Sequence, residues 1–247
     1  MTLGDFSAQA DVYQRSRPGY PGQLLATLLA EAAIGPGDKV VDLGAGTGIF
    51  TRLLVERGLS VTAIEPNEAM MQQADRSATR WIKGTFEAIP LPDQSQRWAV
   101  AAQAFHWAGP QLALPEIRRI LKPDTLFTVI WNNRAPKSSE IVAWTESLIQ
   151  KHIPEFDEAY RRKNWSGVLE STGDFTFLSH HVTAHIVIMS RERYVALWRS
   201  HNRLNNIAGE QRFALFLNEL ENYLHHHQID QINVPYRCEA WSARRRD

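Results

Sequence analysis

Short apolar runs alternate with amphipathic stretches along the first half of the chain. The apolar runs predict strands, and the amphipathic stretches between them predict helices. The strands are expected at 39–43, 60–64, about 81–83, 97–103 and 125–131, and the helices at 22–33, 48–57, 67–77 and 111–121. This alternation predicts an α/β fold with a mostly parallel, doubly wound sheet.

The pattern changes after residue 131. Helices are expected at 138–151, 155–164, 191–201 and 210–225, and alternating apolar and polar positions predict strands at 180–188 and 232–243. No stretch rich in glycine, serine or proline separates two regions, and no segment repeats. A single domain over residues 1–247 is therefore expected.

The first predicted strand runs into a glycine turn. Val41 and Asp42 lie near its end, and Gly44, Gly46 and Gly48 follow at alternate positions before a helical pattern begins. Glycines at such a turn let the backbone approach a ligand closely. The dinucleotide fingerprint is G-x-G-x-x-G, which is one residue longer than the G-x-G-x-G found here. The spacing therefore favours a ligand without phosphates.

An acidic residue, Glu65, ends the second predicted strand, seventeen residues after Gly48. A carboxylate at this place can accept hydrogen bonds from both hydroxyls of a ribose. The turn and the carboxylate together predict a site for an adenosyl group. The alternative is a tight structural turn beside a surface glutamate, and the paired spacing disfavours it.

The segment 40–51 together with Glu65 resembles the nucleotide-binding signature of class I S-adenosylmethionine-dependent methyltransferases. Four further segments extend the resemblance over about the first 130 residues, and the Phe-His-Trp and Trp-Asn elements are similar to those of the trans-aconitate methyltransferase-like branch. These segments are 6–21, 84–93, 103–107 and 116–123. The resemblance implies a Rossmann-like seven-stranded sheet with an antiparallel last strand. It also implies an N-terminal lead-in segment (1–35) and cap elements at 132–180 and 190–226 over the active face.

The resemblance implies S-adenosylmethionine as the cofactor and S-adenosylhomocysteine as the product. Asp42 and the glycine turn would shape the methionine and ribose region, Glu65 would hold the ribose, and Phe86 would pack on the adenine. Arg17 would face the cofactor carboxylate, or else be a solvated turn residue. The expected cofactor set is Tyr13, Arg17, Asp42, Gly44, Ala45, Gly46, Gly48, Glu65, Pro66, Asn67, Thr85, Phe86, Glu87, Gln103 and Ala104.

His106, at the end of the fourth predicted strand, is the catalytic candidate. It could act as a general base, as a hydrogen-bond donor to the substrate, or as a structural histidine. A carboxylate acceptor needs no base, whereas a hydroxyl acceptor does. Trp107, Trp131, Asn132 and Arg199 are the expected substrate residues, with ordinary core packing or a solvated helix face as the alternative for each.

Composition and charge limit the partners and metal sites to be expected. The 247 residues carry 27 basic and 27 acidic side chains, so no net charge draws the protein to nucleic acid or to anionic membranes. The single cysteine excludes an internal disulfide and a cysteine-rich metal site. Three successive histidines at 225–227 point about 100° apart on a helix, so no metal site is expected there. No secretory signal and no apolar run of about 18 residues is present, which predicts a cytoplasmic protein.

The expected function is methyl transfer from S-adenosylmethionine to a small molecule through a carboxylate or a hydroxyl. One alternative is a non-catalytic module that binds S-adenosylmethionine. Another is a nicotinamide-dependent oxidoreductase, which the glycine spacing and the lack of a Tyr-x-x-x-Lys pair disfavour. The acceptor and the oligomeric state are left open by the sequence.

Overall fold

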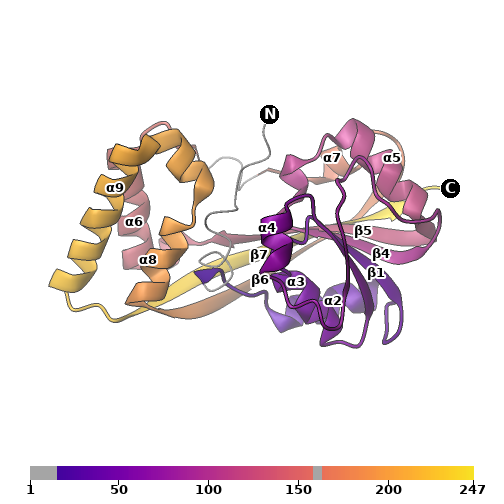
Figure 1. Ribbon diagram of the computed structural model, residues 1–247, viewed down its shortest axis with the longest axis horizontal. Coiled ribbons are helices and arrows are strands. Elements are labelled where there is room, and N and C mark those ends of the chain that lie inside the picture. The colour runs from indigo at the N-terminus through magenta and orange to yellow at the C-terminus, as the bar shows by residue number, and fades with distance from the viewer. Residues whose placement is uncertain (1–15, 158–162) are drawn as a thin grey trace. The chain divides into compact units, whose positions relative to one another are not determined.

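The computed structural model describes residues 16–157 and 163–247, and the chain forms two compact units (Figure 1). The sheet unit comprises Gly19–Asn132, Asn164–Thr183 and Cys238–Asp247. The helical unit comprises Met1–Pro18, Asn133–Lys163 and Ala184–Arg237. The expectation of a single domain over 1–247 stays a prediction.

Seven strands form one sheet in the order β3-β2-β1-β4-β5-β7-β6. Parallel pairing joins β1 to β2 and β4, β2 to β3, and β4 to β5. Strand β7 is antiparallel to β6, because Arg246 N donates to Asp174 O at one end and Arg191 N donates to Asp230 O at the other. The bounds are β1 Lys39–Leu43, β2 Ser60–Ile64, β3 Arg80–Ile82, β4 Gln96–Ala102, β5 Leu121–Arg134, β6 Phe175–Ser190 and β7 Gln231–Arg245.

Helices cover both faces of the strands in the sheet unit (Figure 1). Neighbouring residues of β1 point to opposite faces, so Val40 packs with α2 and α3 while Val41 packs with α5 and α7. These helices span Gly22–Glu31 (α2), Ile49–Val55 (α3), Pro110–Ile120 (α5) and Ser166–Leu169 (α7), and the short α4 spans Glu68–Gln72. The predicted doubly wound, mostly parallel sheet with an antiparallel last strand is confirmed.

The helical unit has an apolar core of its own, built by α6, α8 and α9 (Figure 1). The helices span Glu140–His152 (α6), Arg191–Arg199 (α8) and Asn202–His226 (α9). Helix α9 is interrupted at Gly209, where φ is 71° and ψ is 164°. Trp144 of α6 stacks on Tyr223 of α9 with ring centroids 3.7 Å apart. Among the described residues, no helix has both the length and the apolar character needed to cross a membrane.

The helix predicted at 155–164 is wrong in the residues that the structure describes. Residues 155–157 and 163–164, expected to be helical, are not, and residues 158–162 lie outside the described part. Helix α7 begins later instead, at Ser166, whose N–H and hydroxyl both donate to Asn164 Oδ1 in the turn that precedes the helix. Near the start of β5, Asp124 has a left-handed backbone with φ of 57°, which aspartate tolerates better than most residues.

Candidate cofactor and substrate sites

The glycine turn after β1 requires glycine for its geometry. Gly44, Gly46 and Gly48 all have positive φ, at 70°, 58° and 80°. A Cβ on Gly44 would lie 2.5 Å from Ala104 Cβ and 3.3 Å from the Phe86 ring. No side chain can replace Gly44 without moving these neighbours, so the backbone itself forms the surface of the turn.

The glycine turn and the carboxylate of Glu65 meet directly. Gly46 N donates to Glu65 Oε2 at 2.8 Å, and Asn67 N donates to Glu65 Oε1 at 2.9 Å. Burial raises the pKa of Glu65, and the two backbone donors oppose that rise. Each carboxylate oxygen has a further lone pair, so Glu65 can also accept hydrogen bonds from two hydroxyls.

Asp42, at the end of β1, is buried with one oxygen satisfied and one not. Thr51 Oγ1 donates to its Oδ2 at 2.6 Å, whereas Oδ1 has no hydrogen-bond partner. The buried Thr47 hydroxyl also lacks a partner. Burial, reinforced by the charge of Glu65, raises the pKa of Asp42 to about 7 in spite of the Thr51 hydrogen bond. Unsatisfied buried acceptors are costly, so this spot is suited to a ligand that donates hydrogen bonds.

The segment after β3 packs beside the turn. Phe86 is buried against Gly44 and meets Phe105 edge to face, with centroids 5.5 Å apart. Glu87 Oε1 accepts a hydrogen bond of 2.8 Å from Gly109 N, and Thr85 forms an isolated bridge with Ala88.

The rest of this segment is fastened to α5 by an ion pair. Arg119 Nη1 donates to Leu91 O and Arg119 Nη2 to Ile89 O, both at 2.8 Å. Glu116 accepts from Ile89 N at 2.8 Å and from the Arg119 guanidinium, which also bonds Asp93. The sequence did not indicate Arg119, because a Glu and an Arg three residues apart predict only a surface pair on one helix.

Comparisons with known proteins agree with this geometry. A family model described as a methyltransferase domain matches residues 41–129. An uncharacterised methyltransferase of Mycobacterium bovis is 40% identical over 145 residues, which are 58% of this chain and 56% of that protein. A malonyl-acyl-carrier-protein O-methyltransferase of Serratia marcescens is 28% identical over 134 residues, 52% of each chain. The chain thus spans a little over half the length of these relatives.

A solved structure from Anaeromyxobacter dehalogenans, provisionally described as a type II methyltransferase, has the same fold. It matches with a TM-score of 0.64 and 19% identity over 92% of this chain and 97% of that chain. Residues 41–129 therefore match a methyltransferase domain, and the chain has the fold of the class I S-adenosylmethionine-dependent methyltransferases. The resemblance to the superfamily is confirmed, and the trans-aconitate branch stays a prediction.

The remaining cofactor candidates of the sheet unit lie around the same turn. Ala45 N donates to Ile64 O, Pro66 is half-buried, and Asn67 caps α4 by accepting from Ala69 N. Gln103 has a left-handed backbone with φ of 58°, and Ala104 is buried. Their roles toward the cofactor stay predictions.

The chain after β4 and β5 carries the substrate candidates of the sheet unit. His106 and Trp107 are exposed in a short 3-10 helix (Phe105–Trp107) that directly follows Ala104. Asn132 is buried, its side chain donating to Gly19 O at 3.0 Å and its carbonyl accepting from Gln103 Nε2.

Trp131 lies in the core of the sheet unit. Its ring stacks on Trp165 with centroids 4.1 Å apart and meets Trp241 edge to face at 5.8 Å. It is 2% exposed, whereas Trp107 is 47% exposed. Of these two tryptophans, Trp107 has the ring surface that a ligand can reach, and both substrate roles stay predictions.

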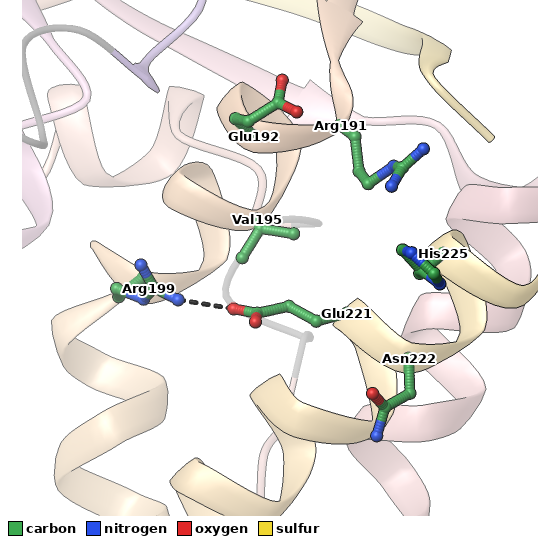
Figure 2. Close-up of a pocket in the computed structure, with 7 residues that line it drawn as sticks. All are labelled: Arg191, Glu192, Val195, Arg199, Glu221, Asn222 and His225. Atoms are coloured by element: carbon green, nitrogen blue, oxygen red, sulfur yellow. Dashed lines mark hydrogen bonds and ion pairs between the residues drawn. The ribbon is translucent and has the colours of Figure 1, made fainter. Parts of the chain in front are cut away.

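Two candidates belong to the helical unit, and Tyr13 lies outside the described residues. Arg17 Nη2 donates to Ser200 O at 3.1 Å. Arg199 forms an ion pair with Glu221 across an open pocket of about 420 Å³ between α8 and α9 (Figure 2). Arg191, Glu192 and His225 also line this pocket, so acidic and basic groups are mixed there. No group of three acidic, histidine or cysteine side chains that could hold a metal ion occurs within the described ranges.

Proposed function

We propose that this methyltransferase binds S-adenosylmethionine at the glycine turn and methylates an oxygen of a small-molecule acceptor, with S-adenosylhomocysteine as the second product. The observation that carries the proposal is the pair of hydrogen bonds that link Glu65 to Gly46 and Asn67. They join the turn and the carboxylate into one site, and this site lies within the segment that the family model matches.

The residues present fit the cofactor. Glu65 has lone pairs left for the ribose hydroxyls, and the bare backbone of Gly44 and Gly46 allows close approach. The unsatisfied Asp42 Oδ1 and the Thr47 hydroxyl would receive the donors of the amino-acid portion. Nothing in this set is basic, which agrees with a nucleoside that carries no phosphate.

Bound S-adenosylmethionine supplies a methyl group that its sulfonium already activates. The chain then has to align the acceptor and exclude water. Phe86 and Ala104 give the turn an apolar wall, since both approach the position that a Gly44 side chain would take. This wall is the part of the site best suited to keeping water away.

Both of the acceptors expected from the sequence, a carboxylate and a hydroxyl, would be methylated on oxygen. The relative named as an O-methyltransferase supports such an oxygen acceptor. A carboxylate reacts without a base, so His106→Ala should then lower kcat by less than about tenfold, well below the roughly 10²-fold that loss of acid–base catalysis costs at least. A hydroxyl acceptor that uses His106 as its base predicts a loss of about 10²-fold and of the ionisation near pH 6–7.

Calorimetric titration of the purified chain with S-adenosylmethionine, S-adenosylhomocysteine and NADH tests the cofactor. The first two should bind and NADH should not. Binding of NADH alone would make the chain an oxidoreductase and end the proposal. Formation of S-adenosylhomocysteine with a panel of carboxylic acids, trans-aconitate included, and of phenols then tests the reaction. Cofactor binding without turnover on the whole panel would point to a non-catalytic module.

A further inference from the structure

The helical unit buries a group of donors that lie outside the glycine turn and Glu65. Arg17, Arg134 and Arg193 come from three separate segments, and Arg193 Nη2 donates to Arg17 O. The charges of all three oppose the rise that burial causes in the pKa of Tyr236, which lies in β7. We call these four residues the arginine cluster. All of them belong to the helical unit.

Arg134 is the most enclosed of the three arginines. Its side chain is 7% exposed, and its guanidinium lies 4.0 Å from the centre of the Trp198 ring. Arg134 Nε donates to Glu146 Oε1 at 3.3 Å, whereas Nη2 is buried without a hydrogen-bond partner. A guanidinium has five N–H donors in a planar fork, so one carboxylate oxygen leaves most of this fork available.

Tyr236 and Arg193 have unsatisfied donors as well. Tyr236 is 2% exposed, and its hydroxyl has no hydrogen-bond partner, although the Arg134 guanidinium approaches it. Arg193 Nη2 donates to Arg17 O at 3.1 Å, while its Nε is buried and unpartnered. Burial raises the pKa of Tyr236 above its ordinary value, so the hydroxyl keeps its proton and remains a donor.

The groups of the cluster without a hydrogen-bond partner are donors, namely Arg134 Nη2, Arg193 Nε and the Tyr236 hydroxyl. An ion pair joins Arg134 to Glu146 through Nε and leaves its Nη2 unsatisfied. Buried donors without acceptors are costly, and guanidinium forks match the paired oxygens of a carboxylate or a phosphate. The unsatisfied chemistry of this cluster is thus that of a missing oxyanion.

We propose that the arginine cluster binds the oxyanion of a small molecule, a carboxylate or a phosphate group. Arg134 Nη2, Arg193 Nε and the Tyr236 hydroxyl are the donors, and Arg17 adds positive charge. The inference rests on the proposed function only where it takes this small molecule to be the methyl acceptor. The binding of an oxyanion itself can be measured without any methyl transfer.

Titration of the full chain with succinate and with inorganic phosphate, at constant ionic strength in chloride, tests the site. At least one of the two should raise the thermal unfolding midpoint and give a saturable heat of binding. Saturation by succinate alone identifies a carboxylate ligand, and saturation by phosphate alone identifies a phosphate ligand. If neither binds more tightly than chloride, the proposal is overturned.

Single substitutions distinguish a loss of oxyanion binding from a loss of folding. Tyr236→Phe removes one donor and keeps the ring, and should weaken oxyanion binding about fivefold, in line with the loss of one hydrogen bond. Arg193→Gln leaves the Arg134–Glu146 pair intact and should weaken oxyanion binding at least tenfold. Arg212→Gln, which removes a part-exposed arginine paired with Glu155 in the same unit, is the matched control and should change nothing.

The cofactor titration distinguishes the two proposals. The affinity for S-adenosylmethionine should be the same in Tyr236→Phe as in the unmodified chain, because the glycine turn and Glu65 lie in the sheet unit and Tyr236 is not among the cofactor candidates. Oxyanion binding that survives both cluster variants unchanged would refute the site even where the methyltransferase proposal holds. Absent cofactor binding with intact oxyanion binding would refute the proposed function alone.

Discussion

The glycine turn of the sheet unit and the arginine cluster of the helical unit differ in the buried polar groups that lack a hydrogen-bond partner. In the sheet unit the unpartnered buried groups around the glycine turn include the carboxylate oxygen of Asp42. In the helical unit the unpartnered groups of the arginine cluster are donors on Arg134, Arg193 and Tyr236. Buried polar groups normally have hydrogen-bond partners, so the unpartnered groups indicate what kind of ligand each site would accept. The glycine turn fits a cofactor that donates hydrogen bonds, and the arginine cluster fits the proposed oxyanion.

Burial acts on titratable groups of the two units with different consequences. In the sheet unit it raises the pKa of Asp42 to about 7, so this carboxyl group changes charge within the physiological range. In the helical unit it raises the pKa of Tyr194 to about 12, which keeps a hydroxyl neutral at every ordinary pH. Ligand binding in the sheet unit should therefore depend on pH, whereas the tyrosine donors of the helical unit should not.

The largest effect is expected from Gly44→Ala. The new Cβ would meet Ala104 Cβ at 2.5 Å on a residue with φ of 70°. We expect a loss of about 5 kcal/mol in the free energy of unfolding, at the upper end for single substitutions, together with loss of cofactor binding. Chemical denaturation and calorimetry measure the two.

Gly37→Ala is the matched control for this substitution. Gly37 has φ of 84° and open space where its Cβ would be, so the substitution changes backbone strain alone. It should cost about 1 kcal/mol and leave cofactor affinity unchanged. Equal losses in the two variants would show that the contact with Ala104 is unimportant and that the turn is merely strained.

The second largest effect concerns Asp42 and pH. Its folded-state pKa of about 7 lies above the ordinary value of 3.8, so the folded protein holds a proton that the unfolded chain releases. Stability should therefore fall as pH rises from about 4 to 7, by up to about 4 kcal/mol, since one pKa unit corresponds to about 1.4 kcal/mol. Denaturation of Asp42→Asn should show this slope removed and greater stability at pH 8 than the unmodified chain.

The same carboxyl links the sheet unit to its ligand. A donor placed on Asp42 Oδ1 would lower the pKa of this carboxyl, so cofactor binding should release a proton near pH 6 and tighten as pH rises to 7. Calorimetry in buffers of different ionisation enthalpy measures the proton. Affinity that is flat across this range would place the donor elsewhere and remove Asp42 from the cofactor site.

Much of the sheet unit could be predicted because its signals are local. The mainly apolar runs at 39–43 and 60–64 match β1 and β2 residue for residue, since strands covered on both faces are rich in apolar residues. The spacing of the glycines and Glu65 predicted a joint site, and the hydrogen bond between Gly46 and Glu65 is what such a site requires.

The helical unit could not be read in the same way. The arginine cluster joins residues 17, 134, 193 and 236, whose separation along the chain leaves no spacing to recognise. For Trp131 the sequence left both a substrate role and core packing open, and its stacking on Trp165 in the core is a contact that only the fold creates. Side-chain partners from distant segments decide these cases, and periodicity carries no information about them.

Glu65→Gln should have the third largest effect. The amide keeps one acceptor oxygen but loses the charge that strengthens its hydrogen bonds. Affinity for S-adenosylmethionine should fall between about tenfold and 100-fold, as for hydrogen bonds to charged groups. Glu68→Gln, at an exposed glutamate paired with Lys83 nearby, is the control and should bind normally. Equal affinity in both variants would contradict the ribose role, while oxyanion binding should be unaffected by either.

The smallest effect is expected from Arg119→Gln, because this residue acts on the cofactor site only through the segment it holds. The substitution removes the bonds to Ile89 O and Leu91 O and leaves Phe86 and Glu87 in place. Without these bonds the segment 86–92 should be less ordered, at a cost of about 1 kcal/mol in the free energy of cofactor binding. The dissociation constant of S-adenosylmethionine should therefore rise about fivefold, and amide exchange over 86–92 should become faster. Arg118→Gln removes a neighbouring arginine of α5 that bonds Arg246 O instead, and should leave both readouts unchanged. Faster exchange with unaltered affinity would show that the segment is held by Arg119 yet does not contribute to the cofactor site, and would confine that site to the glycine turn and Glu65.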